Sequence, residues 1–297
     1  MPLHELAALG AAACWAATGI IAREPAAALG ALSFNRWRQV FATLMFAAYV
    51  AATASWRGLG GGAVAPLLLS GLFGIFLGDS LLFITLNRLG PRRAGILFAL
   101  NAPFAAFLGW LVLGETLAPR TLAGIALTVA GVALAIAYGR RPARQSAWEA
   151  VQGPLWIGIL TGLGAAAGQA TGSLIARPVM QAGADPFAAS LVRVAVAALC
   201  ITLLLRLLPP PAAPRAPLTR RTAALTALAA FLGLGVGMTL LLYALAGGKV
   251  GIVSTLSATS PVLILPMLWA RTGEPPAPGA WAGAALVVAG MALIFLR

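Results

Sequence analysis

The residue of this chain best suited to chemistry inside a membrane is Asp79. It lies deep within a long apolar segment, whereas the other acidic residues fall in loops or near segment ends. A carboxylate at membrane depth is costly, and such residues usually contact substrates, ions or protons. Asp79 could bind an ammonium group, carry a coupling proton or pair with an arginine. The alternative is a structural carboxylate that bonds to Ser80, a neighbouring helix or a buried water.

Aromatic, amide and hydroxyl side chains extend this candidate site. Asp79 and Phe83 are four residues apart, as are Thr239 and Tyr243, so each pair shares one face of a helix. An apolar, aromatic-lined site with a few polar groups suits an amphipathic ligand. Ordinary helix packing is the alternative role for each of them. The candidate binding residues are Trp15, Asp79, Phe83, Asn101, Gln169, Thr239 and Tyr243.

Prolines and glycines form a second group of candidates. A proline inside a helix removes a backbone hydrogen bond, and in a membrane the freed carbonyl needs a partner or a water-filled cavity. Glycines at four-residue intervals allow two helix backbones to touch. We expect hinges or cavity walls at these positions, with fixed kinks and simple packing as the alternatives. They are Pro103, Pro261, Pro266, Gly78, Gly168 and Gly237.

Two arginines, Arg38 and Arg193, occupy similar depths in two other apolar segments. A guanidinium can hold a carboxylate through two parallel hydrogen bonds, so both residues are candidates for binding an anionic group. Long arginine side chains also snorkel along a helix to the headgroups of a bilayer. We favour a structural role for both arginines and keep carboxylate binding as the alternative.

The elements that carry these residues are ten apolar segments, which fill almost the whole chain. Each is long enough to cross roughly 30 Å of hydrocarbon as a helix. The sequence therefore predicts an all-α integral membrane protein with ten transmembrane helices. The segments lie at about 3–22, 31–54, 65–87, 92–113, 119–138, 154–176, 186–208, 221–245, 249–270 and 278–296.

These segments form two copies of five. Residues 119–134 (PRTLAGIALTVAGVAL) match residues 278–293 (PGAWAGAALVVAGMAL), and residues 10–23 resemble residues 164–177. Because each copy has an odd number of segments, the copies insert in opposite orientations, as in secondary transporters. We predict one repeat at 1–138, a linker at 139–153 and a second repeat at 154–297, arranged around a central cavity.

Paired glycines recur in the last segment of each copy. Gly124 and Gly131 match Gly283 and Gly290, and both pairs are spaced by seven residues. Small residues at such intervals predict close helix packing. The pattern indicates a tight contact between these two segments, or a face used in a dimer.

Composition excludes several other classes of protein. The chain is 61% hydrophobic and 9% charged with a mean hydropathy of +0.94, whereas soluble domains carry about 25% charged residues. Its net charge of +13 comes largely from arginines in short loops, which are topology signals rather than a nucleic-acid surface. Cys14 and Cys200 lie in apolar segments and His4 is the single histidine. We therefore expect no metal, no cofactor, no catalytic residues and no enzyme activity.

Loop charges give an expected orientation. Basic residues are more frequent after odd-numbered segments than after even-numbered ones. The positive-inside rule then places the odd loops in the cytoplasm and both termini outside.

Short motifs recur at matching places in both copies. They are Asn101-x-Pro103, Ser260-Pro261, Gly114-Glu115 and Gly273-Glu274, the last two each followed by Pro-x4-Gly-x6-Gly. On these motifs the chain resembles the drug/metabolite transporter superfamily, in the branch built from two tandem EamA domains, and the resemblance covers nearly the whole chain. General likeness is greatest to bacterial exporters of aromatic and other amino acids. The resemblance implies alternating access around a central cavity lined by segments one, three, four, six, eight and nine.

We therefore predict a multi-pass secondary transporter that exports amino acids, aromatic ones included, across a bacterial inner membrane. The alternative is efflux of cationic drugs or other toxic metabolites, with Asp79 as the charge partner. Exchange of phosphorylated metabolites is a weaker third reading, because a phosphate needs several converging basic side chains. The expected partners are an amino acid substrate and the lipid bilayer, with proton coupling and a monomer or homodimer left open.

Overall fold

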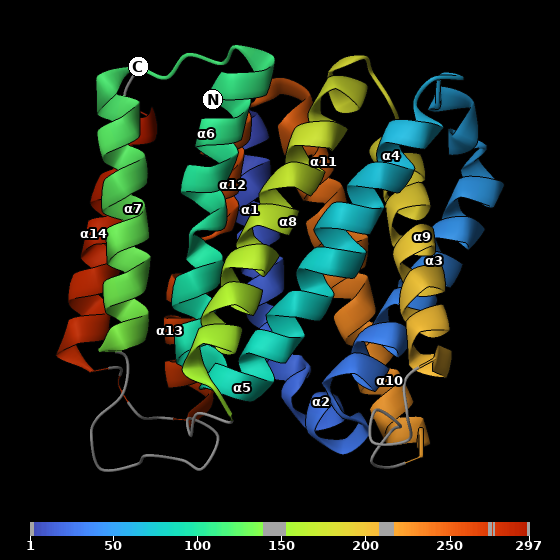
Figure 1. Cartoon of the computed structure of the whole chain (residues 1–297), viewed down its shortest axis with the longest axis horizontal. Helices are drawn as coiled ribbons and strands as arrows, with labels where there is room; N and C mark the ends of the chain where they lie inside the picture. The colour runs from blue at the N-terminus through green and yellow to red at the C-terminus, as the bar shows by residue number, and fades with distance from the viewer. Residues whose placement is uncertain (1–2, 139–152, 208–216, 273–274, 276, 296–297) are drawn as a thin grey trace.

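The chain folds as a bundle of helices. The computed structural model describes residues 3–138, 153–207, 217–272, 275 and 277–295, and within these ranges it contains no β-strand. Figure 1 shows most helices upright and side by side. The first half contains α1 (Leu3–Ile21), α2 (Arg23–Leu29), α3 (Ala31–Thr53), η1 (Ser55–Gly58), α4 (Val64–Ser70), η2 (Gly71–Leu77), α5 (Gly78–Ala99), α6 (Asn101–Leu113) and α7 (Pro119–Ala137). The second half contains α8 (Leu155–Gln181), α9 (Pro186–Leu207), α10 (Arg220–Ala230), η5 (Phe231–Met238), α11 (Thr239–Gly247), α12 (Val250–Ser257), α13 (Ser260–Thr272) and α14 (Pro278–Phe295).

The bundle has the length and apolarity of a multi-pass membrane protein. Within the described ranges, seven helical stretches can cross a bilayer by length and composition, and two shorter apolar helices correspond to α7 and α14. Helix α3 is not among them, since it carries Arg36, Arg38 and Gln39. The all-helical membrane class is supported, whereas the predicted count of ten spans is not confirmed. The predicted linker lies outside the described residues except for Gly153.

Equivalent helices of the two repeats run in opposite directions. At the start of α1, the His4 ring nitrogen Nδ1 lies 3.0 Å from the carbonyl oxygen of Tyr243 in α11. Near the end of α8, Arg177 donates a 3.4 Å hydrogen bond to the carbonyl of Leu245, which also lies in α11. The start of α1 and the end of α8 therefore lie at one end of the bundle, where Figure 1 also places both termini.

The two repeats make matching contacts through their glycines. In one half, a β-carbon on Gly74 would lie 3.1 Å from the Gly172 Cα of α8. In the other half, a β-carbon on Gly233 would lie 3.0 Å from the hydroxyl of Thr18 in α1. Glycine at these positions lets α8 approach η2 and lets α1 approach η5, so the core forms between the repeats.

Both of these contacts use a π-helical segment. The segments η2 and η5 are the only π-helices among the described residues. The sequence at residues 78–82 (GDSLL) recurs at residues 237–241 (GMTLL), so Asp79 and Met238 occupy equivalent positions of the repeat. Segment η5 ends at Met238, and η2 ends two residues before Asp79. A π-helical turn inside an α-helix is uncommon and frequently accompanies a functional site. The unusual backbone therefore marks the same place in both repeats.

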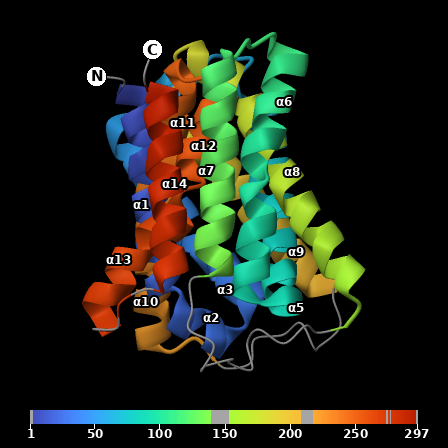
Figure 2. The same cartoon turned by 90° about the vertical axis from the view of Figure 1, so that its left-hand side faces the viewer.

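The predicted glycine contact between α7 and α14 is present. The two helices lie side by side in both views (Figures 1 and 2). A β-carbon on Gly131 would lie 2.7 Å from the Gly283 carbonyl oxygen, and one on Gly124 would lie 2.7 Å from that of Gly290. The backbones therefore touch at two levels within one chain.

We expect Gly283→Ala to lower the free energy of unfolding by about 1–3 kcal/mol, the usual cost of overpacking. The new β-carbon would lie 2.4 Å from the backbone nitrogen of Ala135, which cannot move without shifting α7. Detergent-solubilised protein unfolded by heat gives the measurement. The matched control is Gly19→Ala in α1, where the nearest atom is 3.5 Å away on a flexible Ile264 side chain. Equal losses in the two variants would contradict a tight seam.

Candidate functional site

An ion pair joins α3 to α5 inside the bundle. The Arg38 Nη2 atom donates to Asp79 Oδ2 over 2.7 Å, with the two side chains 13% and 19% exposed. The same nitrogen donates to Asn35 Oδ1 at 3.0 Å, and the guanidinium carbon lies 5.7 Å from the Phe83 ring centroid. Asp79 and Phe83 therefore share a helix face as predicted, and that face meets Arg38.

Arg193 makes the corresponding contact in the second repeat. Its side chain is completely buried, and Nη1 donates to the sulfur of Met238 at 3.1 Å. Arg38 and Arg193 each lie about two helical turns, roughly 10 Å, from the start of their helices. Met238 occupies the position of Asp79 in the repeat, so both halves join an arginine to this position. The prediction that Arg193 snorkels to the headgroups is wrong, because its guanidinium is buried and contacts Met238 of η5.

Around these charges lie buried polar atoms without a hydrogen-bond partner. They come from α3, α5 and α9, within about one helical turn of Arg38, Asp79 or Arg193. Leaving a buried polar group unpaired costs about 1–3 kcal/mol, so such clusters need a reason to persist. The atoms are Asn35 Nδ2, Arg38 Nε, Gln39 Nε2 and Oε1, Ser80 Oγ, Ser190 Oγ, and Arg193 Nε and Nη2.

Gln169 of α8 belongs to this region. A β-carbon on Gly74 would lie 3.3 Å from Arg193 Nη2 and 3.9 Å from Gln169 Oε1, so both side chains flank one glycine. A β-carbon on Gly168 would lie 2.9 Å from the Phe73 carbonyl and 3.2 Å from the Gly78 Cα. Gly78 and Gly168 therefore permit the close approach that places Gln169 beside Arg193.

Trp15 and Thr239 lie beside η5, the π-helical segment of the second repeat. The indole nitrogen of Trp15 donates to the Gly233 carbonyl at 2.9 Å, and a β-carbon on Gly237 would lie 2.8 Å from it. Thr239, the first residue of α11, is buried, and its hydroxyl donates to the Gly235 carbonyl of η5 at 2.6 Å. Trp15, Gly237 and Thr239 are thus grouped around η5, next to Met238.

Tyr243 lies apart from this group. Its ring stacks on His4 with centroids 4.9 Å apart, at the end of the bundle that holds both termini, and it is 39% exposed. Tyr243 is also offset from the repeat equivalent of Phe83. Phe83 lies four residues after Asp79, which corresponds to Met238. Tyr243 lies four residues after Thr239 and therefore five after Met238. The two aromatic residues therefore point in directions that differ by one residue step, about 100°.

Asn101 lies where segment four is interrupted. Leu100 separates α5 from α6, and Asn101 Nδ2 donates to the Phe98 carbonyl at 2.7 Å. Segment nine is interrupted at the equivalent place, where the Ser260 hydroxyl donates to the Ser257 carbonyl at 3.1 Å. These side chains add hydrogen bonds to backbone carbonyls at the two interruptions, where the regular helical pattern stops.

The prolines lie just after these breaks or within the following helix. Pro103 and Pro261 are in the first turns of α6 and α13, where a missing N–H removes no helical bond. Pro266 lies inside α13, which continues through it. Pro266 therefore does not interrupt its helix. The two interruptions lie next to Asn101 and Ser260.

A second buried ion pair was missed by the sequence reasoning. Glu115, after α6, accepts a hydrogen bond from Nε of Arg177 in α8, and the side chains are 10% and 7% exposed. The other Glu115 oxygen accepts from the backbone nitrogen of Val250 at 2.9 Å, and Lys249 donates to the Thr116 carbonyl. This network ties the first repeat to the second. The repeated Gly-Glu pair was the available signal.

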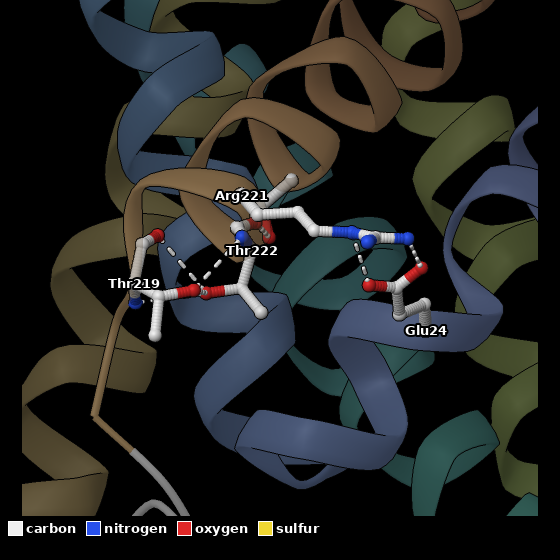
Figure 3. A network of polar contacts seen from close by, with 5 residues as sticks. Glu24, Thr219, Arg221 and Thr222 are labelled. Atoms are coloured by element: carbon white, nitrogen blue, oxygen red, sulfur yellow. Dashed lines mark hydrogen bonds and ion pairs between the residues drawn. The ribbon is translucent and has the colours of Figure 1, made fainter.

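The opposite end of the bundle carries a weaker contact between the repeats. Figure 3 shows Arg221 of α10 paired with Glu24 of α2, with Nε 2.7 Å from Oε1 and Nη2 2.9 Å from Oε2. Thr219 and Thr222 form a capping box that begins α10 beside it. The paired side chains are 77% and 49% exposed, so water and salt weaken their attraction.

Comparison with known proteins agrees with the repeat and with the fold. The model of the EamA-like transporter family matches residues 3–137 and again residues 156–296. A chain from a solved structure, "Crystal structure of protein", has a TM-score of 0.79 at 19% identity, covering 99% of this chain and 96% of that one. Among curated proteins, none matches the sequence. With two family domains covering nearly all of its length, the chain belongs to the EamA-like transporter family of the drug/metabolite transporter superfamily.

Proposed function

We propose that this chain is a secondary transporter that exports amino acids, aromatic ones included, across a bacterial inner membrane by alternating access. Membership of the EamA-like family supports a transporter of small solutes. The observation that carries the substrate class is the buried Arg38–Asp79 pair with Arg193 nearby, inside an otherwise apolar bundle. A zwitterion offers complementary charges to both kinds of group.

The same cluster argues against the alternative of cationic drugs. Asp79 is already paired with Arg38, and it also interacts electrostatically with Arg193. Two guanidinium groups and one carboxylate carry one formal positive charge in excess. A cation entering this region would be repelled, while a solute with a carboxylate would be attracted.

Alternating access needs contacts that close each end in turn. Glu115–Arg177 joins the repeats at the end with both termini, and Glu24–Arg221 joins them at the other end. We propose that the end with both termini faces outward, as the positive-inside rule predicts from the loop charges. In this proposal both predicted repeats, 1–138 and 154–297, contribute helices to the wall of the central cavity.

The test is transport by the purified chain in proteoliposomes. Labelled phenylalanine, threonine, a lipophilic cation and a sugar phosphate are followed in parallel, with empty liposomes as the control. We expect saturable movement of the amino acids, and an imposed pH gradient drives their accumulation if Asp79 carries a coupling proton. Movement of the cation alone would favour drug efflux, and movement of no amino acid would overturn the proposal.

A further inference from the structure

We infer that Arg193 is the site that holds the carboxylate of the transported solute, an inference that rests on the proposed function. Its basis is a difference between two equivalent contacts. In the first repeat, Arg38 meets a carboxylate, Asp79. In the second repeat, Arg193 meets the neutral thioether of Met238. The repeat keeps the arginine in both halves but supplies a directly hydrogen-bonded carboxylate in only one.

The atoms of Arg193 that lack a partner are the right ones for a carboxylate. Nη1 points to Met238, while Nε and Nη2 are buried and unpaired. Nε and Nη2 form one edge of the planar guanidinium, with two N–H bonds side by side. This edge matches the two oxygens of a carboxylate, which arginine binds through two parallel hydrogen bonds.

The described residues that flank this edge are neutral, and Asp79, which attracts Arg193 electrostatically, is hydrogen-bonded to Arg38 instead. Gly74 provides space without a side chain, Gln169 flanks it from α8, and the unpaired hydroxyl of Ser190 lies one turn away on α9. Asp79 is engaged by Arg38 over 2.7 Å. A solute carboxylate would therefore complete the charge balance of the cluster, and the buried edge becomes accessible when the helices around it separate.

Met238 has a defined role in this inference, because an acidic residue there would neutralise Arg193 from within the protein. The sulfur contacts Nη1 and leaves the edge of Nε and Nη2 free. Aspartate at this position would reproduce the pairing of the first repeat and compete with the solute. The identity of one side chain thus decides whether the second arginine is available.

The first part of the test is direct binding to the purified full-length chain in detergent, by calorimetry. The probes are phenylpropionate and isovalerate, each compared with its uncharged amide, phenylpropionamide or isovaleramide. We expect the carboxylates to bind at least about ten-fold more tightly, as charge-assisted hydrogen bonds imply. Equal binding of acid and amide, or no binding of either acid, would overturn the inference.

The second part uses two variants of one residue. Met238→Asp is expected to remove the preference for the acids, and Met238→Leu, which adds no charge, is expected to keep it within about three-fold. A wild-type preference in Met238→Asp contradicts the inference. If that variant does not fold, Arg193→Lys replaces it: lysine keeps the charge but loses the planar edge, so acid binding should fall about ten-fold. An unchanged preference for the acids in Arg193→Lys would also contradict the inference.

These results are separable from those for the proposed function. Transport of phenylalanine without discrimination between acid and amide would refute the Arg193 site and leave amino acid export standing. Tight binding of the acids without movement of any amino acid would support the Arg193 site and refute amino acid export.

Discussion

Replacing Asp79 with asparagine is expected to lower the free energy of unfolding by about 3–5 kcal/mol. Asparagine keeps the shape of the side chain but removes the carboxylate that compensates Arg38 at 2.7 Å and interacts with Arg193. Two buried guanidinium groups then remain without a counter-ion, and desolvated charge is costly in a membrane protein. Unfolding of the purified variant in detergent, followed by circular dichroism, gives the measurement.

Asp185→Asn is the matched control for this substitution. The Asp185 carboxylate accepts from the backbone nitrogens of Phe187 at 3.0 Å and Ala188 at 2.9 Å at the start of α9. Asparagine caps a helix about as well as aspartate, so little stability should be lost. Adding Arg38→Met to Asp79→Asn should restore most of the loss, since the excess charge returns to its original value. If Asp79→Asn unfolds no more readily than the control, the carboxylate does not hold this cluster.

Replacing Glu115 with glutamine is expected to open the end of the bundle that holds both termini. The carboxylate joins Arg177 and the Val250 nitrogen, so its loss weakens the contact between repeats. In the open state Arg177 becomes hydrated, and each 1.4 kcal/mol removed from the closed state raises the open population about ten-fold. Opening is read from the labelling of Ala244→Cys, a buried position in α11, by an impermeant maleimide applied to either face.

The background for this experiment lacks Cys14 and Cys200, the two free cysteines. We expect labelling to accelerate at least about ten-fold in Glu115→Gln. The control is Glu24→Gln, which removes the exposed pair with Arg221 at the other end and should change labelling little. An unaltered labelling rate in Glu115→Gln would show that the buried pair does not keep this end closed.

The class of fold was predictable because it depends on local properties of the sequence. Apolar segments about 20 residues long indicate membrane helices, and matched motifs such as those ending in Arg23 and Arg177 reveal the repeat. The π-helical segments were not predictable. Their glycine-rich sequences fit several backbone forms, and packing against Gly172 and Thr18 selects one of them.

The site was predictable only in part, because its contacts link residues far apart in the chain. The shared face of Asp79 and Phe83 follows from helical spacing. The partner of Asp79 is 41 residues away on another helix, and Arg177 is 62 residues from Glu115. Helical spacing puts Tyr243 on one face with Thr239, yet Tyr243 stacks on His4 at the end of the bundle. Pairing across helices is set by tertiary packing, which spacing alone does not encode.

The seam between α7 and α14 has a consequence for how this sequence can diverge. Gly131 faces Gly283 and Gly124 faces Gly290, so each level is made by one residue from each copy. A larger side chain in either copy collides with the backbone of the other, and no compensating change in the partner glycine can create room. A side chain at any of these four positions is therefore excluded by the backbone of the other copy. The four glycines stand at matching places in residues 119–134 and 278–293, so the same restriction acts on both copies of the repeat.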